Sequence, residues 1–397
     1  MRNKEIDLMK AMGIIYVVGG HYYIHRTFGY PHHTSALPIF YFVSGYFFKS
    51  VDGFRLKLSF CFKKTKELLL PYFLYYVLFT MISYFLLIFL SIKTIGETLE
   101  VDLLGYPLSL ILKPFFGGIS IVLAQSWFIT DLWIMLITMQ IIYHNKNNSK
   151  IIDLVYFLCL LSLACAGIHW SSTTPHLNGP SIGSHSTLKH NKFKLVLIRT
   201  WMGLIIFFFG MVYRVHIEKY QTILFTGKTF GLAFIAICQL QYYYQDDISY
   251  LHYNADFLSA PVWLPILVSF ISVFIFLFIA KCLAKHIHND DILFKIGNET
   301  YHILCQHMII FLFLNVLNIG LFGDKNFKVL DWNAFYRTKP EMNWPLFVGC
   351  GVLVPTFSAI YMRRFVPELG KKIHTLIMKL QTTDKKLYCR KVIPQMT

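Results

Sequence analysis

The run ELLLPYFLYYVLFTMISYFLLIFLSI, residues 67–92, decides the fold of this chain. It is continuously apolar after Glu67, whereas a half-buried strand alternates apolar and polar residues. A helix needs about 20 apolar residues to cross the hydrocarbon core of a bilayer, and this run is long enough. Because lipid offers the backbone no hydrogen-bond partner, the continuous pattern predicts membrane-spanning helices.

The composition supports a membrane protein. Of the 397 residues, 55% are hydrophobic and only 15% are charged. Soluble domains carry about a quarter charged residues, so the bilayer is the expected solvent of this chain. The formal net charge is +16, but Lys and Arg stand in short segments between apolar runs. This distribution is typical of basic cytoplasmic loops, and it argues against a nucleic-acid partner.

We predict an all-α, polytopic transmembrane helix bundle of about ten spans. Every second connection is basic, which places those connections and both termini in the cytoplasm. Residues 1–365 form the predicted membrane domain, and residues 366–397 form a basic cytoplasmic tail. The predicted spans are 8–25, 36–49, 67–92, 126–143, 151–168, 196–213, 229–245, 260–280, 298–319 and 344–362.

Ionisable side chains inside a span are functional candidates, because burying a charge in lipid is costly. Lys10 and His21 are eleven positions apart on the first span, close to three helical turns, so they share a face. The helical rise between them is about 16 Å, which places His21 near the bilayer centre if Lys10 marks the cytoplasmic boundary. We expect His21 to be catalytic; a structural histidine bonded to another helix is the alternative.

The ninth span carries a polar stripe at helical spacing, formed by Asn298, His302, Cys305 and Gln306. His307 stands one position beside this stripe, about 13 Å along the helix axis from Asn298 and at a depth comparable to that of His21. Hydrogen bonding between helices explains His302 and Gln306 as well as a functional role does. For His307 we favour the functional role.

Trp127 and Asp131 lie at the outer end of the fourth span. A tryptophan ring can stack on a sugar, and a carboxylate can bind a sugar hydroxyl or orient an imidazole. The alternative is an interfacial tryptophan belt with an Asp that reaches toward the headgroups.

The outer loops are rich in histidine, and most cysteines lie inside apolar runs. None of these loop histidines forms a pair with the spacing of two metal ligands within a clearly predicted helix, and the cysteines form no recognisable framework. We therefore predict no metal site.

Five motifs stand in order along the chain. Together they resemble the acyltransferase-3 family, whose membrane O-acyltransferases act on bacterial polysaccharides, lipopolysaccharide, peptidoglycan and some small molecules. Lys10, Lys63 and Lys66 stand where many relatives carry Arg, whose guanidinium fork for phosphate a lysine lacks. The motifs are NKEIDLMKAMGI at 3–14 followed by His21, PIFYFVSGYFF at 38–48, KKTKELLLPY at 63–72, SWFI at 126–129, and IGNETY at 296–301 followed by His307.

The resemblance implies an acyl donor, usually acetyl-CoA, on the cytoplasmic side and a sugar hydroxyl of a cell-surface or exported polysaccharide as acceptor. It implies no tightly bound cofactor, and a multi-pass location in the bacterial cytoplasmic (inner) membrane. Lys63, Lys64 and Lys66 form a basic patch suited to the donor's phosphates, although the positive-inside rule explains them too. His21 is the expected general base, since an imidazole has an unperturbed pKa of about 6.5 and can take a proton at neutral pH. In the variant mechanism, His21 carries the acyl group as a transient acyl-His.

Supporting roles follow on the same basis. His307, Asn298 or Ser44 would stabilise the oxyanion or orient the acceptor, and Lys10 would close the cytoplasmic end or pair with Glu67 or a phosphate. The rival hypothesis is a transporter or flippase for a sugar or lipid-linked glycan, which also places polar residues in mid-membrane. The lack of a visible repeat between the two halves argues mildly against it, and the five ordered motifs argue more strongly. A membrane sensor or scaffold that uses the same fold without chemistry is a third hypothesis. The expected donor- and substrate-binding residues are Lys10, Lys63, Lys66, Ser44, Trp127, Asp131, Asn298 and Tyr301.

Overall fold

The apolar runs form helices. The computed structural model describes residues 3–21, 32–89, 127–144, 149–172, 185–249, 261–288, 291–322, 343–365 and 368. No strand occurs among these residues, so the all-α prediction is confirmed for the part of the chain that is described. The predicted tail 366–397 lies outside it, apart from residue 368.

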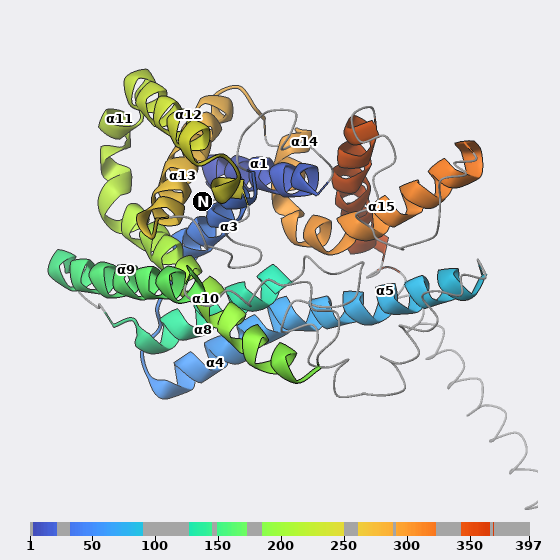
Figure 1. Ribbon diagram of the computed structural model, residues 1–397, viewed down its shortest axis with the longest axis horizontal. Helices are drawn as coiled ribbons and strands as arrows, with labels where there is room; N and C mark the ends of the chain where they lie inside the picture. Colours follow the sequence, from blue (N-terminus) through green and yellow to red (C-terminus); the bar gives the residue numbers. More distant parts are fainter. Residues whose placement is uncertain are drawn as a thin grey trace, which may run out of the picture.

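The helices follow the predicted spans with shifted ends (Figure 1). In chain order they are α1 Lys4–Gly20, α3 His32–Phe47, α4 Phe54–Lys64, η1 Thr65–Leu69, α5 Leu70–Phe89, α8 Trp127–Ile142, α9 Lys150–Ser172, α10 His185–Val212, η3 Tyr213–Ile217, η4 Glu218–Tyr220, α11 Gln221–Leu224, α12 Gly227–Ser249, α13 Trp263–Ala284, α14 Ile292–Asn298 and α15 Thr300–Phe322. A last helix runs over Asn343–Phe365.

Four helices in the described ranges are long and apolar enough to cross a membrane by length and composition: Lys150–Ser171, Lys194–Leu224, Trp263–Ala284 and Asn343–Phe365. Shorter apolar helices cover Ser35–Phe47, Trp127–Ile142 and Thr300–Asn315. The total of about ten spans and the cytoplasmic placement of both termini stay predictions.

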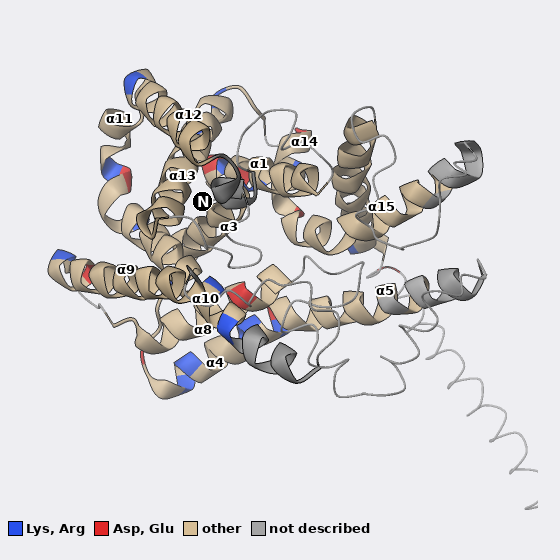
Figure 2. Cartoon of the chain, in the orientation of Figure 1, with Lys and Arg blue, Asp and Glu red and all other residues tan. Residues whose placement is uncertain are grey.

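Helix α1 lies inside the bundle. It packs against α3, α13, α14 and α15, and most of its residues are buried, including Ile6, Met9 and Val18. Charged residues form isolated bands on otherwise uncharged helices, and some of these bands gather where α8 and α10 meet (Figure 2). Helix α9 differs from α1, because Ile151, Val155 and Leu158 expose their side chains. Such an apolar outer face is expected of a helix that borders lipid.

The most extensive helix contact joins α3 to α10, and a glycine makes it possible. A Cβ atom at Gly45 would lie only 1.7 Å from the main-chain oxygen of Phe207, so no other residue fits there without moving a backbone. Small residues permit such close approach of membrane helices. Gly45 of the second motif therefore has a packing function at this crossing.

The third predicted span begins earlier than expected. Helix α4, the π-helical turn η1 and α5 follow one another without a break, so the helix starts at Phe54 rather than near residue 67. The π-helical turn keeps the chain helical. It contains one residue more than an α-helical turn, because its hydrogen bonds run from residue i to residue i+5. We call Phe54–Phe89 the long rod.

Candidate active site

Two histidines that were predicted separately lie face to face. His21 caps the C-terminal end of α1, and His307 lies in the second turn of α15. Their ring centroids are 5.4 Å apart and their planes differ by 19°, so the imidazoles stack. His21 is 7% exposed and His307 is fully buried. The structure thus brings both expected catalytic residues into one place inside the helix bundle.

The backbone fixes which nitrogen of His307 carries hydrogen. Its Nδ1 lies 2.9 Å from the main-chain oxygen of Ile303, four residues earlier. A carbonyl oxygen only accepts, so Nδ1 donates, and Nε2 of the neutral ring keeps its lone pair. Within the described residues Nε2 is buried and has no hydrogen-bond partner. This nitrogen is therefore an acceptor that a ligand hydroxyl can satisfy.

The N-terminal half of α1 is held against α14. A Cβ atom at Gly297 would lie 2.1 Å from the main-chain oxygen of Asp7, so the motif glycine permits this contact. Helix α14 ends at Asn298, and α15 begins at Thr300. The predicted span 298–319 thus corresponds to α15 with a shifted start, because Glu299 separates α15 from α14.

Asn298 stands at this break and is half-buried. Its Oδ1 is buried without a hydrogen-bond partner in the described part of the chain. Ser44 lies at the α3–α10 crossing instead, and no hydrogen bond joins it to either histidine among the described residues. The structure thus gives Asn298 an open acceptor, while Ser44 stands next to the packing glycine Gly45.

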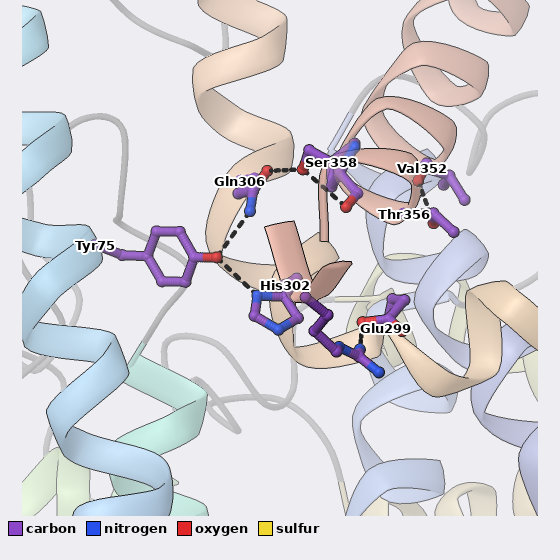
Figure 3. Close-up of polar contacts among 9 residues, drawn as sticks. Tyr75, Glu299, His302, Gln306, Val352, Thr356 and Ser358 are labelled. Atoms are coloured by element: carbon purple, nitrogen blue, oxygen red, sulfur yellow. Dashed lines mark hydrogen bonds and ion pairs between the residues drawn. The ribbon is translucent and has the colours of Figure 1, made fainter. Parts of the chain in front are cut away.

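The polar stripe on α15 forms a chain of hydrogen bonds to two other helices (Figure 3). The Tyr75 hydroxyl lies 2.7 Å from His302 Nδ1 and accepts from Gln306 Nε2 at 2.8 Å. Ser358 on the last helix donates to Gln306 Oε1 at 2.9 Å. Of the two readings left open by the sequence, the bonds show helix–helix contact for His302 and Gln306.

A buried carboxylate lies beside this chain. Glu299 is 2% exposed and pairs with Arg363, which reaches in from the last helix (Figure 3). The bonds from Ser358 and Arg363 hold Asn343–Phe365 against the start of α15. Removing Arg363 would leave the buried Glu299 carboxylate without its cation, so this contact helps to hold the last helix in place.

Lys10 is paired within its own helix. Its Nζ lies 2.7 Å from Asp7 Oδ1, one turn earlier, and the Asp7 side chain is 3% exposed. Glu67, the expected alternative partner, instead binds Lys64 at 2.7 Å. The Lys10–Glu67 pair is therefore not formed, and Lys10 neutralises a buried carboxylate.

The basic patch of the long rod contacts the helix that carries His307. Lys63 is 70% exposed along its side chain, and Lys66 is exposed without an ion pair among the described residues. Two residues after Lys66, the main-chain oxygen of Leu68 accepts from the Tyr301 hydroxyl at 2.7 Å. From Tyr301 to His307 the rise along α15 is about 9 Å. Basic side chains thus lie close to the helix that leads to the histidine pair.

Trp127 and Asp131 are inside the protein. Trp127 is 2% and Asp131 is 1% exposed, so the alternative of an interfacial belt with an outward-reaching Asp was wrong. Both carboxylate oxygens of Asp131 lack a hydrogen-bond partner in the described residues. Arg199 lies over the Trp127 indole, with its Cζ 4.0 Å from the ring centroid.

Arg199 was not predicted. It is 6% exposed within the long apolar helix Lys194–Leu224, and it interacts electrostatically with Asp131. An arginine within a predicted span is a signal that sequence reasoning can use, because such residues are rare and seldom face lipid. Most of the outer-loop histidines lie outside the residues whose side chains are described.

Comparison with known proteins adds to this geometry. A family model described as an acyltransferase domain, acyltransferase-3, matches residues 3–363. The chain belongs to the acyltransferase-3 family. The resemblance inferred from five ordered motifs is thereby confirmed over nearly the whole chain. Searches of curated proteins and of solved structures each gave no match. As an acyltransferase-3 protein with helices long enough to span a bilayer, the chain is a multi-pass membrane acyltransferase.

Proposed function

We propose that this protein moves an acetyl group from cytoplasmic acetyl-CoA to a hydroxyl of a cell-surface or exported polysaccharide, in a bacterial cytoplasmic membrane. The single observation that carries the proposal is the stacked His21–His307 pair, buried inside the bundle, with an open acceptor nitrogen on His307. Acyl transfer to a hydroxyl requires a base beside the reacting oxygen, and a neutral imidazole is suited to this at neutral pH.

The reaction divides between the two rings. His21 takes the proton of the reacting hydroxyl, the oxygen attacks the thioester carbonyl, and the carbon–sulfur bond breaks. The proton then passes from His21 to the departing thiolate, so that no charge is left on the protein. His307 accepts a hydrogen bond at Nε2 from a neighbouring hydroxyl of the sugar and so orients the acceptor. Its fixed Nδ1–H favours this role over binding of an oxyanion, which requires a donor.

The donor is placed by the long rod. Exposed Lys63 and Lys66 attract the donor's phosphates, and the Tyr301–Leu68 bond holds that part of the rod against α15. Trp127 and Asp131 are proposed to contact the acceptor from α8, and Asn298 offers a further acceptor atom at the α14–α15 break. Lys10 acts through Asp7, by keeping the cytoplasmic half of α1 in position.

The first test replaces His21 by Ala. O-acetylation of surface glycans, measured by mass spectrometry, should disappear while the amount of membrane-inserted protein stays normal. His286→Ala is the matched control, because His286 is exposed and its side chain makes no hydrogen bond in the described residues. Unchanged acetylation in His21→Ala cells, with altered accumulation of a solute, would instead support a transporter.

A second test follows the acyl group across the membrane. Labelled acetyl-CoA supplied only to the cytoplasmic face of oriented vesicles should label a glycan on the other face. The rate should fall with His21→Ala and stay unchanged with His286→Ala. If wild-type vesicles that contain the acceptor incorporate no label, the proposed donor or acceptor is wrong.

A further inference from the structure

A polar cavity lies away from the histidine pair, at the ends of several helices. Its volume is about 360 Å³, and it is lined by residues that follow α3 and α8, lie in the first turn of α9, end α10 and form η3. Its charged lining residues are Lys49, Asp52, Asp153 and Arg214. A cavity of this size holds a small polar group rather than a single water molecule.

Two cations of the cavity have donors to spare. Lys49 forms no ion pair and no hydrogen bond in the described residues, although Asp52 is close in sequence. Arg214 uses Nη1 on the main-chain oxygen of Tyr46 at 2.7 Å, and no other bond of its guanidinium occurs in the described residues. A guanidinium has five N–H donors, so the remaining ones are available to a ligand.

One carboxylate of the cavity is already satisfied. Asp153 Oδ1 accepts from the Tyr143 hydroxyl at 2.9 Å, and Oδ2 lies 2.7 Å from His216 Nε2. Asp52 and Asp153 balance the charges of Lys49 and Arg214, so the spare N–H donors of these two cations, and not a net positive charge, are what can bind an anion. Phosphate is the anion that suits a lysine and an arginine together, because it accepts charge-assisted bonds from both.

An apolar groove of about 390 Å³ adjoins this cavity and is lined by residues of α8 and α9. Ile142 and Ile152 line the groove, while the next residues, Tyr143 and Asp153, line the cavity. The rings of Tyr143 and Tyr156, one from each lining, lie 5.2 Å apart. A polar cavity beside an apolar groove matches a molecule with a charged head and a hydrocarbon chain.

The position of the site indicates which amphiphile occupies it. Lys49, Lys150 and Arg214 belong to the basic connections that the positive-inside rule assigns to the cytoplasm. The groove follows α9, whose exposed Ile151, Val155 and Leu158 are expected to face lipid. The cavity is therefore at the depth of headgroups and the groove at the depth of acyl chains.

We propose that the cavity and groove bind one phospholipid of the inner leaflet, with its phosphate on Lys49 and Arg214 and an acyl chain along α9. This lipid joins the ends of α3, α8, α9 and α10. The site requires no acyl transfer, so it stands whether or not the proposed reaction is correct.

The test uses the full-length protein in mild detergent, with short-chain phosphatidylglycerol as the probe and the thermal unfolding midpoint as the readout. The lipid should raise the midpoint of the wild type, and Lys49→Ala should weaken the apparent affinity about tenfold, as loss of a charge-assisted bond predicts. Lys150→Ala is the matched control, since Lys150 is an exposed cation near the site that lines neither cavity nor groove. Equal affinity of wild type and Lys49→Ala would overturn the site.

A second pair of variants tests the groove. Val155→Trp fills the groove and should weaken phosphatidylglycerol binding, whereas Leu158→Trp on the same helix should not, because Leu158 does not line it. Soluble glycerol phosphate serves as the probe that has the phosphate but no acyl chain. It should raise the thermal unfolding midpoint far less than phosphatidylglycerol does. If glycerol phosphate acts as strongly as phosphatidylglycerol, or both Trp variants behave alike, the occupant is not a lipid.

Discussion

The Tyr301 hydroxyl donates to the main-chain oxygen of Leu68, 2.7 Å away. This bond joins the basic part of the long rod to the helix that carries His307. In the proposed reaction the donor's phosphates lie on one side of the bond and the thioester on the other. The placement of Tyr301 in the family motif thereby has a physical explanation, since its hydroxyl sets the distance between the rod and α15.

Tyr301→Phe should therefore weaken donor binding without removing the catalytic histidines. Loss of one hydrogen bond lowers the free energy of unfolding by about 0.5–1.5 kcal/mol. We expect a higher KM for acetyl-CoA, an unchanged KM for the acceptor and a small decrease of the thermal midpoint. The control is Tyr361→Phe, because Tyr361 is 64% exposed. Equal kinetics of the two variants would contradict this role.

The two histidines should separate in kinetics. His21→Ala should lower kcat by about 10²–10⁴-fold, the usual contribution of a general base. His307→Ala should chiefly raise KM for the acceptor, because the ring offers an acceptor atom that orients a hydroxyl. Initial rates at varied acceptor concentration distinguish these outcomes. If His21→Ala chiefly raised the KM for the acceptor and His307→Ala chiefly lowered kcat, the proposed roles of the two histidines would be reversed.

The basic residues of the rod should not be equivalent. Lys64 is held by Glu67 at 2.7 Å, whereas Lys66 has no ion pair among the described residues. Lys66→Ala should raise KM for acetyl-CoA, more so at low salt, while Lys64→Ala should change it little. Lys66→Arg should lower the KM for acetyl-CoA, because a guanidinium binds phosphate with two parallel hydrogen bonds. Donor titrations at two ionic strengths give the comparison, and equal effects at positions 64 and 66 would contradict it.

Lys10 should matter for stability more than for donor binding. Lys10→Ala removes the cation beside the buried Asp7 carboxylate, which should cost about 1–3 kcal/mol because the lysine itself is partly exposed. The double variant Lys10→Ala with Asp7→Asn removes the charge as well and should recover part of the loss. Thermal midpoints without ligand measure both. A double variant that is no more stable than Lys10→Ala would argue against the pair.

Gly45→Ala should harm folding although it adds a single methyl group. The new Cβ would collide with the main-chain oxygen of Phe207, at the most extensive helix contact in the described structure. Overpacking of this kind typically costs about 1–3 kcal/mol. Gly349→Ala is the control, since nothing lies within 4 Å of its added Cβ. The yield of folded protein in the membrane and its thermal midpoint should both fall for Gly45→Ala alone.

The helices could be predicted because each apolar run follows from the demand of lipid for internal hydrogen bonds. The helix ends could not. Nothing in Phe54–Lys64 breaks a helix, so α4 joins η1 and α5, although its Lys and Arg residues made it look like a loop. Conversely Glu299 interrupts a run that seemed continuous, and there it pairs with Arg363 from a distant helix.

The candidate site was predictable residue by residue but not as an arrangement. His21 and His307 stood out as ionisable residues in apolar spans, yet only packing decides that their rings stack. Hydrogen-bond partners were the least predictable part. Lys10 takes Asp7 instead of Glu67, and Asp131 is buried near Arg199. Such pairings depend on contacts between segments far apart in sequence, which local patterns do not contain.

The π turn at Thr65–Leu69 determines the angular register of the long rod. In an α-helix each residue rotates the chain by about 100°. The extra residue of the turn therefore decides which side of the rod presents Lys66 while Tyr75 points at His302. A deletion of one residue after Lys66 in this turn would leave Lys66 and Tyr75 in the chain but rotate them against each other by about a quarter of a circle, so that they no longer face the same helix.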